Sequence, residues 1–161
     1  MPPHPPYGGF GIRFLGHVLD SILYGLVTLP FAVASFVLFR VAFEDCFTIG
    51  DDDTIHCPNG ALKGGPLALG IILLVAGAVV ALLLYIRHLG RTGQTWGRKI
   101  VGIKVVDRDR LVPIGMGRAL GRTFFSVISA YALYLGYLWM LWDKQKQTWQ
   151  DKIVSSIVVK A

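Results

Sequence analysis

Long apolar stretches alternate with short polar segments along this chain. Three stretches carry no Lys, Arg, His, Asp or Glu, namely residues 21–39, 64–86 and 123–142, and each has 19 to 23 residues. An α-helix rises about 1.5 Å per residue, so each stretch is long enough to cross a hydrocarbon layer about 30 Å thick. Backbone amides find no water inside a bilayer, and we therefore predict membrane-spanning helices rather than strands.

The first stretch has an alternative interpretation as a cleaved signal peptide. Ala32-Val33-Ala34 resembles a cleavage site. However, the apolar run continues through residues 35–39 without a clear boundary. This continuity favours a retained helix.

A weak internal repeat appears at an offset of 53 residues. Residues 94–101 (QTWGRKIV) are echoed by residues 147–154 (QTWQDKIV), and the echo extends to Val105-Val106 and Val158-Val159. Each copy follows an apolar stretch closely and then becomes rich in β-branched residues, which favour strands. We predict strands over residues 99–106 and 153–160 that pair as a small ribbon. Because an isolated two-stranded ribbon is marginal, it would have to lean on helices or lipid.

That pairing constrains the third apolar stretch. Both strands must lie on the same side of the membrane, so the chain between them must cross an even number of times. Residues 113–142 are too few for two full crossings of about 20 residues each. We therefore favour a re-entrant helical hairpin, broken around residues 129–136. The alternative is one ordinary third span, which would place the C-terminus outside.

The charges orient the predicted helices. The chain is 53% apolar and only 16% charged, far from the quarter that soluble domains carry, and its net charge is +6. The segment 44–63 between the first two spans is acidic, whereas residues 87–122 are strongly basic. Positively charged loops stay in the cytoplasm, so we predict a cytoplasmic N-terminus, an outward acidic loop and a cytoplasmic C-terminus. The basic excess is then a topology signal, with anionic lipid headgroups as the partner and no nucleic acid.

Both cysteines lie in the predicted outward loop. Cys46 and Cys57 are eleven positions apart, and a disulfide between them is reasonable in an oxidising compartment. The alternative is two unpaired thiols near the lipid surface. No metal site is predicted, because neither a CxxC motif nor a Cys/His zinc spacing is present.

One face of the first helix is polar. Arg13, His17, Asp20, Tyr24 and Thr28 recur at steps of three and four, which places them on one side of a helix. A charged group inside a bilayer costs at least about 2.5 kcal/mol. Asp20 should therefore face other helices, with a cation or a proton to neutralise it. Its role could be to carry charge, with His17 as a proton relay, or to hold the packing through a buried ion pair.

Four blocks together resemble the RDD family, small and mostly bacterial membrane proteins named for one arginine and two aspartates. The blocks are RFLGHVLD (13–20), GQTWGRK with GIKVVD (93–99 and 102–107), Arg122, and QTWQDK (147–152). The resemblance covers roughly residues 8–160. It implies a bacterial inner membrane and a role in transport, and it implies no substrate or cofactor.

Arg13 and Asp20 match the arginine and the first aspartate of the family, and Asp151 matches the second. Gly16 fits the small residue common three positions after the arginine. Family members often carry His before the last aspartate, whereas this chain has Gln150, so no proton-relay role transfers there. Asp151 is either a surface carboxylate or a partner of Arg13 or Arg122 that ties the tail to the first helix.

These observations predict an all-α integral membrane protein. It would contain two full transmembrane helices, a third apolar segment (re-entrant hairpin or third span) and a small cytoplasmic two-stranded β-ribbon. We predict a flexible tail over residues 1–11 and a single membrane domain over residues 12–160.

The function predicted from the sequence is transport of ions or small solutes, with coupling to protons through Asp20 as one option. The alternative is a scaffold, an assembly factor or a lipid-binding module. No nucleotide-binding loop, HExxH motif or GxSxG motif is present, so we predict no enzyme. Because two spans and a hairpin enclose little space, a transport pathway would require a homo-oligomer.

Overall fold

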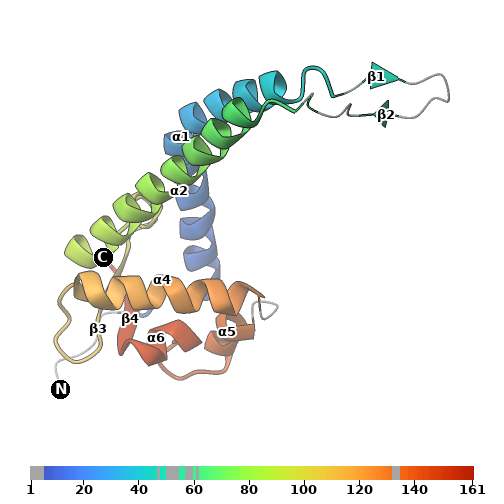
Figure 1. The fold of residues 1–161 in the computed structure, drawn as a ribbon. Coiled ribbons are helices and arrows are strands. Elements are labelled where there is room, and N and C mark those ends of the chain that lie inside the picture. Colours follow the sequence, from blue (N-terminus) through green and yellow to red (C-terminus); the bar gives the residue numbers. More distant parts are fainter. Residues whose placement is uncertain (1–5, 47, 50–54, 57–59, 61, 132–134) are drawn as a thin grey trace. The chain divides into compact units, whose positions relative to one another are not determined.

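A computed structural model describes residues 6–46, 48–49, 55–56, 60, 62–131 and 135–161 (Figure 1). Two long helices are its largest elements, with two short strands between them and the other short elements after the second. The elements in chain order are α1 (Phe10–Ala42), β1 (Thr48–Ile49), β2 (Ile55–His56), α2 (Gly64–Thr92), α3 (Trp96–Ile100), β3 (Ile103–Asp107), α4 (Gly115–Tyr131), α5 (Leu135–Leu138), a 3-10 turn η1 (Trp139–Leu141), α6 (Trp149–Ile153) and β4 (Ser156–Lys160).

The chain forms two compact units. The first comprises Met1–Tyr24 and Leu83–Ala161, and the second comprises Gly25–Leu82. Helices α1 and α2 each run from one unit into the other. The single membrane domain over residues 12–160, which would include parts of both units, stays a prediction.

α1 and α2 are long and apolar enough to cross a bilayer. Only 11% of the most apolar window in each is buried, with mean hydropathies of 2.2 and 3.0. The core helix of a soluble protein would bury such a face, so these exposed apolar surfaces fit a lipid environment. The structure thus has helices that could span a membrane at the two places predicted.

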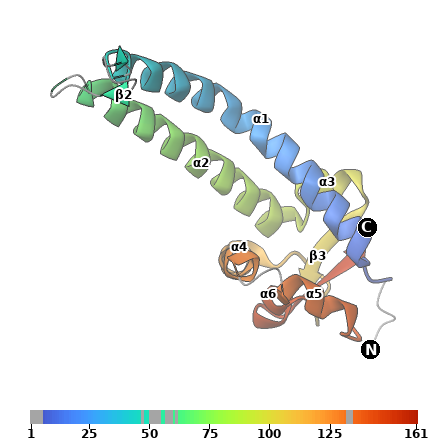
Figure 2. The same ribbon diagram turned by 90° about the vertical axis from the view of Figure 1, so that its right-hand side faces the viewer.

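In the second unit, the two helices run side by side (Figure 2). Ser35 Oγ donates a hydrogen bond to the carbonyl of Gly70 at 2.9 Å. A Cβ added at Gly70 would come within 2.6 Å of the Phe39 ring, and one at Gly77 within 2.8 Å of Phe31. The glycines thus let the backbones approach closely, as small residues commonly do between membrane helices.

The loop after α1 holds the acidic segment. Lys63 Nζ lies 3.2 Å from Glu44 and 3.1 Å from Asp45, all exposed. Cys46 is buried and takes part in a disulfide. Cys57 lies outside the described residues, so the Cys46–Cys57 pairing stays a prediction.

In the first unit, β3 and β4 pair antiparallel, as the repeat predicts. Val105 lies opposite Val158, which is its own counterpart at the offset of 53. The two copies are therefore related by a local twofold axis through this pair. Val105 and Val158 pack against Ile86, Leu89 and Ala119 from α2 and α4, so the ribbon does lean on helices.

The predicted strands were too long at their N-terminal ends. Lys99 lies in α3 and Ile153 in α6, each a helix of five residues that precedes its strand. Thr95 and Thr148 occupy the N-cap positions of these helices. A threonine at the N-cap favours the start of a helix. At these positions this preference outweighs the strand preference of the β-branched residues that follow.

Left-handed backbone recurs at equivalent places in the two copies. Gly93 and Gly102 have φ of 71° and 66°, and their counterparts Lys146 and Ser155 each have φ of 51°. A side chain in this conformation costs roughly 1–2 kcal/mol. The second copy therefore carries strain that glycine relieves in the first.

We expect Ser155→Gly to stabilise the protein by about 1 kcal/mol, because glycine adopts φ near +50° without the clash of a Cβ. Thermal unfolding of the full chain in detergent would show a midpoint about 2–4 °C higher. Gly102→Ser is the matched control, since a Cβ there meets nothing within 4 Å. It should lower the midpoint through backbone strain alone. An unchanged midpoint in both variants would contradict the strain assignment.

Residues 6–9 pair with β4 ahead of α1, and the flexible tail over residues 1–11 stays a prediction. Gly8 N donates to the carbonyl of Val158 at 2.9 Å, and Lys160 N donates to that of Pro6 at 3.0 Å. This pairing satisfies the outer edge of β4, and α1 begins at Phe10. Residues 1–5 lie outside the described residues.

The third apolar stretch forms no helix long enough to span a membrane in its described part. α4 ends at Tyr131 and α5 begins at Leu135, within the predicted break. Tyr137 and Ser126 share a hydrogen bond through their hydroxyls, and a Cβ at Gly136 would collide with Ser129. The chain therefore folds back on α4. That this hairpin enters the bilayer stays a prediction, and a third span is not confirmed.

Candidate functional site

Asp151 is the centre of a buried charge network in the first unit. It is fully buried and lies in the first turn of α6. Its backbone N–H donates to Thr148 Oγ1 at 3.4 Å, while its Oδ2 accepts the Thr148 N–H at 3.2 Å. This capping box fixes the carboxylate against its own helix. Ser156 Oγ donates to Oδ1 at 3.2 Å.

Two arginines from other helices bind the same carboxylate. Arg13 Nη1 donates to Asp151 Oδ2 at 2.9 Å, and Arg122 donates to Oδ1 through Nε at 2.8 Å and Nη2 at 2.6 Å. Both pairings considered from the sequence therefore occur together, and they connect α1, α4 and α6. Burial alone would raise the pKa of Asp151, but the charges of Arg122 and Arg13 outweigh burial and lower its pKa below the ordinary range.

Asp20 lies in a separate buried cluster around the start of α3. Its Oδ1 accepts the Gly97 N–H at 2.8 Å, and its Oδ2 accepts the Thr95 hydroxyl at 2.5 Å. The side chain thereby caps α3 from another helix, since Thr95 makes no cap bond of its own. Arg98 Nε lies 4.0 Å from Oδ2. The neutralising cation expected for Asp20 is thus Arg98.

The two buried clusters lie at equivalent positions of the internal repeat, but the residue at that position is basic in the first copy and acidic in the second. Arg98 and Asp151 are counterparts at the offset of 53. In α1, Asp20 lies near Arg98 and Arg13 contacts Asp151. Helix α1 therefore carries Asp20 for the first copy and Arg13 for the second, and each has the charge opposite to its partner's.

Arg98 is the residue that sequence reasoning missed. The sequence placed it in the basic segment 87–122 and in the block GQTWGRK (93–99), but it was not among the predicted site residues. It is buried, its Nη2 donates to Tyr85 Oη at 2.8 Å, and its guanidinium lies 5.7 Å from the centre of the Tyr85 ring. The repeat could have indicated this role, because Arg98 in the first copy is equivalent to Asp151 in the second.

The remaining residues of the predicted polar face divide between the two units. Tyr24 is buried in the first unit, where its ring stacks on that of Trp96 with centroids 4.8 Å apart. Thr28 belongs to the second unit and bonds the carbonyl of Gly25 in its own helix at 2.9 Å. Tyr24 therefore packs beside the Asp20 cluster, and Thr28 does not take part in it.

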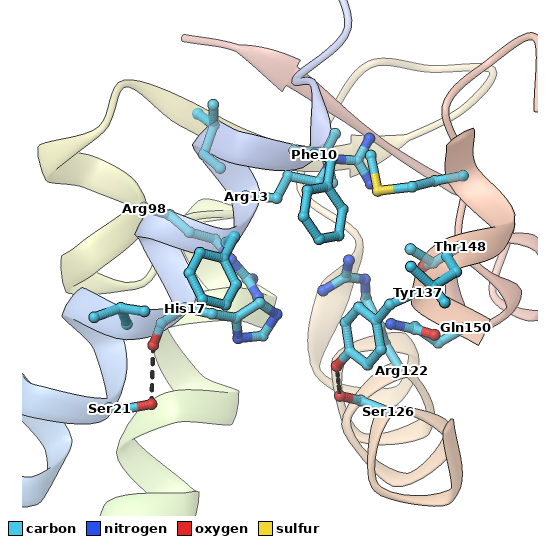
Figure 3. A pocket seen from close by; sticks show the side chains of 16 residues that line it. Phe10, Arg13, His17, Ser21, Arg98, Arg122, Ser126, Tyr137, Thr148 and Gln150 are labelled. Atoms are coloured by element: carbon cyan, nitrogen blue, oxygen red, sulfur yellow. Dashed lines mark hydrogen bonds between the residues drawn. The ribbon is translucent and has the colours of Figure 1, made fainter. Parts of the chain in front are cut away.

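A pocket of about 540 Å³ lies beside the network. Its lining includes Arg13, His17, Arg98 and Arg122, together with the apolar side chains of Phe10, Phe14, Val18, Leu138 and Met140. Figure 3 shows Arg13, His17 and Arg98 on one side of this space, with Arg122, Tyr137 and Gln150 across from them. The His17 ring packs edge-on against that of Tyr137, with centroids 5.7 Å apart. Asp20 and Asp151 do not line the pocket, but their arginine partners do.

The sequence matches one protein family over nearly the whole chain. The RDD family matches residues 7–155, a range that contains Arg13, Asp20 and Asp151. The chain belongs to the RDD family. With its two exposed apolar helices, it is an RDD-family membrane protein.

Three bacterial proteins are similar to this chain in sequence. The chain is 26% identical over 157 residues to the proline-rich antigen of Mycobacterium leprae, covering 96% of this chain and 61% of that protein. It is 34% identical over 70 residues to the proline-rich antigen homolog of Mycobacterium tuberculosis (strain H37Rv), covering 44% and 29% of the two chains. It is 24% identical over 138 residues to the uncharacterized protein YxaI of Bacillus subtilis, covering 86% and 87%. The chain thus spans less than two thirds of the two antigens. No solved structure matches it significantly.

Proposed function

We propose that this RDD-family protein takes part in the transport of ions or small solutes across a bacterial inner membrane. The observation that carries the proposal is the pocket of about 540 Å³, lined by arginines and His17 beside a helix suited to span the bilayer. Charged groups in such a position are costly to bury and are a mark of ion and substrate pathways.

Within this proposal, the membrane topology is the one the charges favour. The N-terminus and the basic segment lie in the cytoplasm and the acidic loop lies outside. Two spanning helices enclose little space, so the transporting form is a homo-oligomer. The exposed apolar residues of α1 and α2 offer surface for such an assembly.

Asp20 is the group proposed to carry charge or a proton. Its hydrogen bonds to Thr95 and Gly97 also give it a structural role, so a test must separate transport from folding. Asp20→Asn suits this purpose, because the amide is nearly isosteric and can still accept the Gly97 N–H while it removes the charge near Arg98.

We expect purified wild-type protein in vesicles to dissipate a pH gradient in the presence of one class of ion or solute from a broad panel. Asp20→Asn should abolish this flux, while the thermal unfolding midpoint shows that the protein stays folded. Asp109→Asn, at an exposed carboxylate, is the matched control and should keep wild-type flux. Unchanged flux in Asp20→Asn, or no wild-type flux with any solute, would reject the proposal.

A lipid-binding scaffold is the second candidate, and α4 favours it. This helix exposes an apolar stripe while it directs Ala119 and Arg122 inward, and the stripe comprises Met116, Leu120, Phe124, Val127, Ile128 and Tyr131. The nearby Trp139 and Trp142 are also exposed. Such a face is typical of a helix that lies in the membrane interface. Absence of flux in the vesicle experiment would leave this function as the better supported one.

A further inference from the structure

We propose that the pocket holds a phosphate group, presented on a lipid headgroup or free in solution, between the guanidinium groups of Arg13 and Arg98. The proposal deepens the transport function by naming a ligand class for the same pocket. It is tested by binding rather than by flux, so the two can fail separately.

Two buried guanidinium nitrogens carry the inference. Arg13 and Arg98 are 8% and 3% exposed, and both line the pocket. Among the described residues, Arg13 Nη2 and Arg98 Nη1 have no hydrogen-bond partner, whereas Arg13 Nε and Nη1 and Arg98 Nη2 donate hydrogen bonds within the protein. Buried charged donors without a partner are costly, so native structures rarely leave them so.

The balance of charge favours an anion over water as the missing partner. Three buried guanidinium groups, of Arg13, Arg98 and Arg122, line the pocket, and they pair with only two buried carboxylates, those of Asp20 and Asp151. The third buried carboxylate among the described residues, that of Asp107, pairs with Arg118 instead. Arg122 and Arg13 share Asp151, while Arg98 lies 4.0 Å from an Asp20 oxygen that already accepts the Thr95 hydroxyl. Water could satisfy the free N–H groups, but it could not neutralise the remaining positive charge in a medium of low dielectric constant.

Phosphate fits these donors better than a halide does. Its several oxygens can accept from donors that approach from different helices, and Arg presents paired N–H groups that match phosphate geometry. Arg13 approaches from α1 and Arg98 from α3, on the side of the pocket opposite Arg122 (Figure 3).

The apolar rim indicates how a lipid could present the phosphate. Phe10, Phe14 and Val18 line the pocket and are also exposed on the outer surface of α1. A cavity of about 540 Å³ lies within the range of pockets for small organic molecules and exceeds what a bare ion needs. An acyl chain could therefore lie along this rim while its phosphate reaches the arginines.

The test measures binding to the full chain in neutral detergent. The probes are phosphatidic acid, inorganic phosphate and phosphatidylcholine. Phosphatidylcholine is the comparison lipid, because its headgroup has no net charge. Binding is followed by native mass spectrometry and by the ligand-dependent shift of the thermal midpoint. We expect phosphatidic acid or inorganic phosphate to bind more tightly than phosphatidylcholine.

Three variants locate that binding. Arg98→Gln should weaken it by about ten- to a hundredfold, the loss expected for a hydrogen bond to a charged group. Val18→Trp fills the rim without removing a charge and should weaken it comparably, which covers the case that Arg98→Gln fails to fold. Arg118→Gln is the matched control, because this half-exposed arginine pairs with Asp107 and does not line the pocket.

The outcomes separate the source of the phosphate from the existence of the site. Binding of phosphatidic acid alone supports the site with a lipid as the source, and binding of inorganic phosphate alone supports it with a soluble source. Lack of binding by both, or equal losses in Arg118→Gln and Arg98→Gln, would overturn the proposal. So would full binding in folded Arg98→Gln and Val18→Trp.

Discussion

Asp151→Asn is expected to destabilise the protein by about 3–5 kcal/mol, among the largest effects of any single substitution in this chain. Removing one charge of a buried network leaves its partners buried and unpaired. Here the loss would leave both Arg13 and Arg122 without their shared counter-charge. It would also remove one of the two acceptor oxygens, so an amide could keep either the bonds at Oδ2, from Arg13 and the capped Thr148 N–H, or the bond at Oδ1 from Arg122.

Chemical unfolding of the full chain in detergent, followed by tryptophan fluorescence, would measure this loss. Trp149 stands two residues before Asp151 in α6 and therefore reports on the affected helix. Asp109→Asn provides the control, since the exposed Asp109–Arg108 pair should contribute well under 1 kcal/mol. A change below about 1 kcal/mol in Asp151→Asn would show that the network contributes little to stability.

The lowered pKa of Asp151 also sets the direction of a pH effect. A carboxyl whose pKa is lower in the folded state contributes its full stability above its unfolded pKa of about 4. That contribution is lost as the pH falls through the folded pKa, which lies below the ordinary range. Wild-type stability should therefore decline below about pH 4, and the difference between wild type and Asp151→Asn should shrink over the same interval. A constant difference down to pH 2 would contradict the assignment.

The sequence predicted much of the fold because membrane spans and the repeat leave strong patterns. Uncharged runs of about 20 residues located α1 and α2, and the echo between residues 94–106 and 147–159 located the paired strands. The hydrogen bonds of Gln94 and Gln147 also repeat at the same offset: their amides donate to the carbonyls of Ile103 and Ser156. Local similarity thus specified a local twofold arrangement.

The partners within the site were harder to predict. Arg13, Asp20 and Asp151 were recognised because charges stand out in or near apolar segments. The sequence did not show that Asp20 would lie near Arg98, because the two are separated by a long loop and a second helix. It also did not show that Pro6 and Gly8 would pair with β4, since residues rich in Pro and Gly resemble a flexible tail. Long-range contacts of this kind depend on tertiary packing rather than on local pattern.

Close packing at Gly97 leads to the second large prediction. A Cβ added there would lie 2.5 Å from Asp20 N and from the Gly16 carbonyl oxygen, and 2.9 Å from Asp20 Oδ1. The first two contacts are with backbone, which cannot turn away as a flexible side chain can. Gly97→Ala would therefore force α3 away from α1 and lengthen the hydrogen bond from Gly97 N–H to Asp20.

We expect Gly97→Ala to cost about 3 kcal/mol or more, since overpacking costs about 1–3 kcal/mol and the displaced cap adds to it. Gly117→Ala in α4 is the matched control, because a Cβ there meets nothing within 4 Å. Alanine favours helices over glycine by about 1 kcal/mol, so the control should be neutral or stabilising. Unfolding of both variants in detergent measures the difference. Equal stability would mean that α1 and α3 separate without cost, and Asp20 would then lose its role as the cap that holds Arg98 beside the pocket.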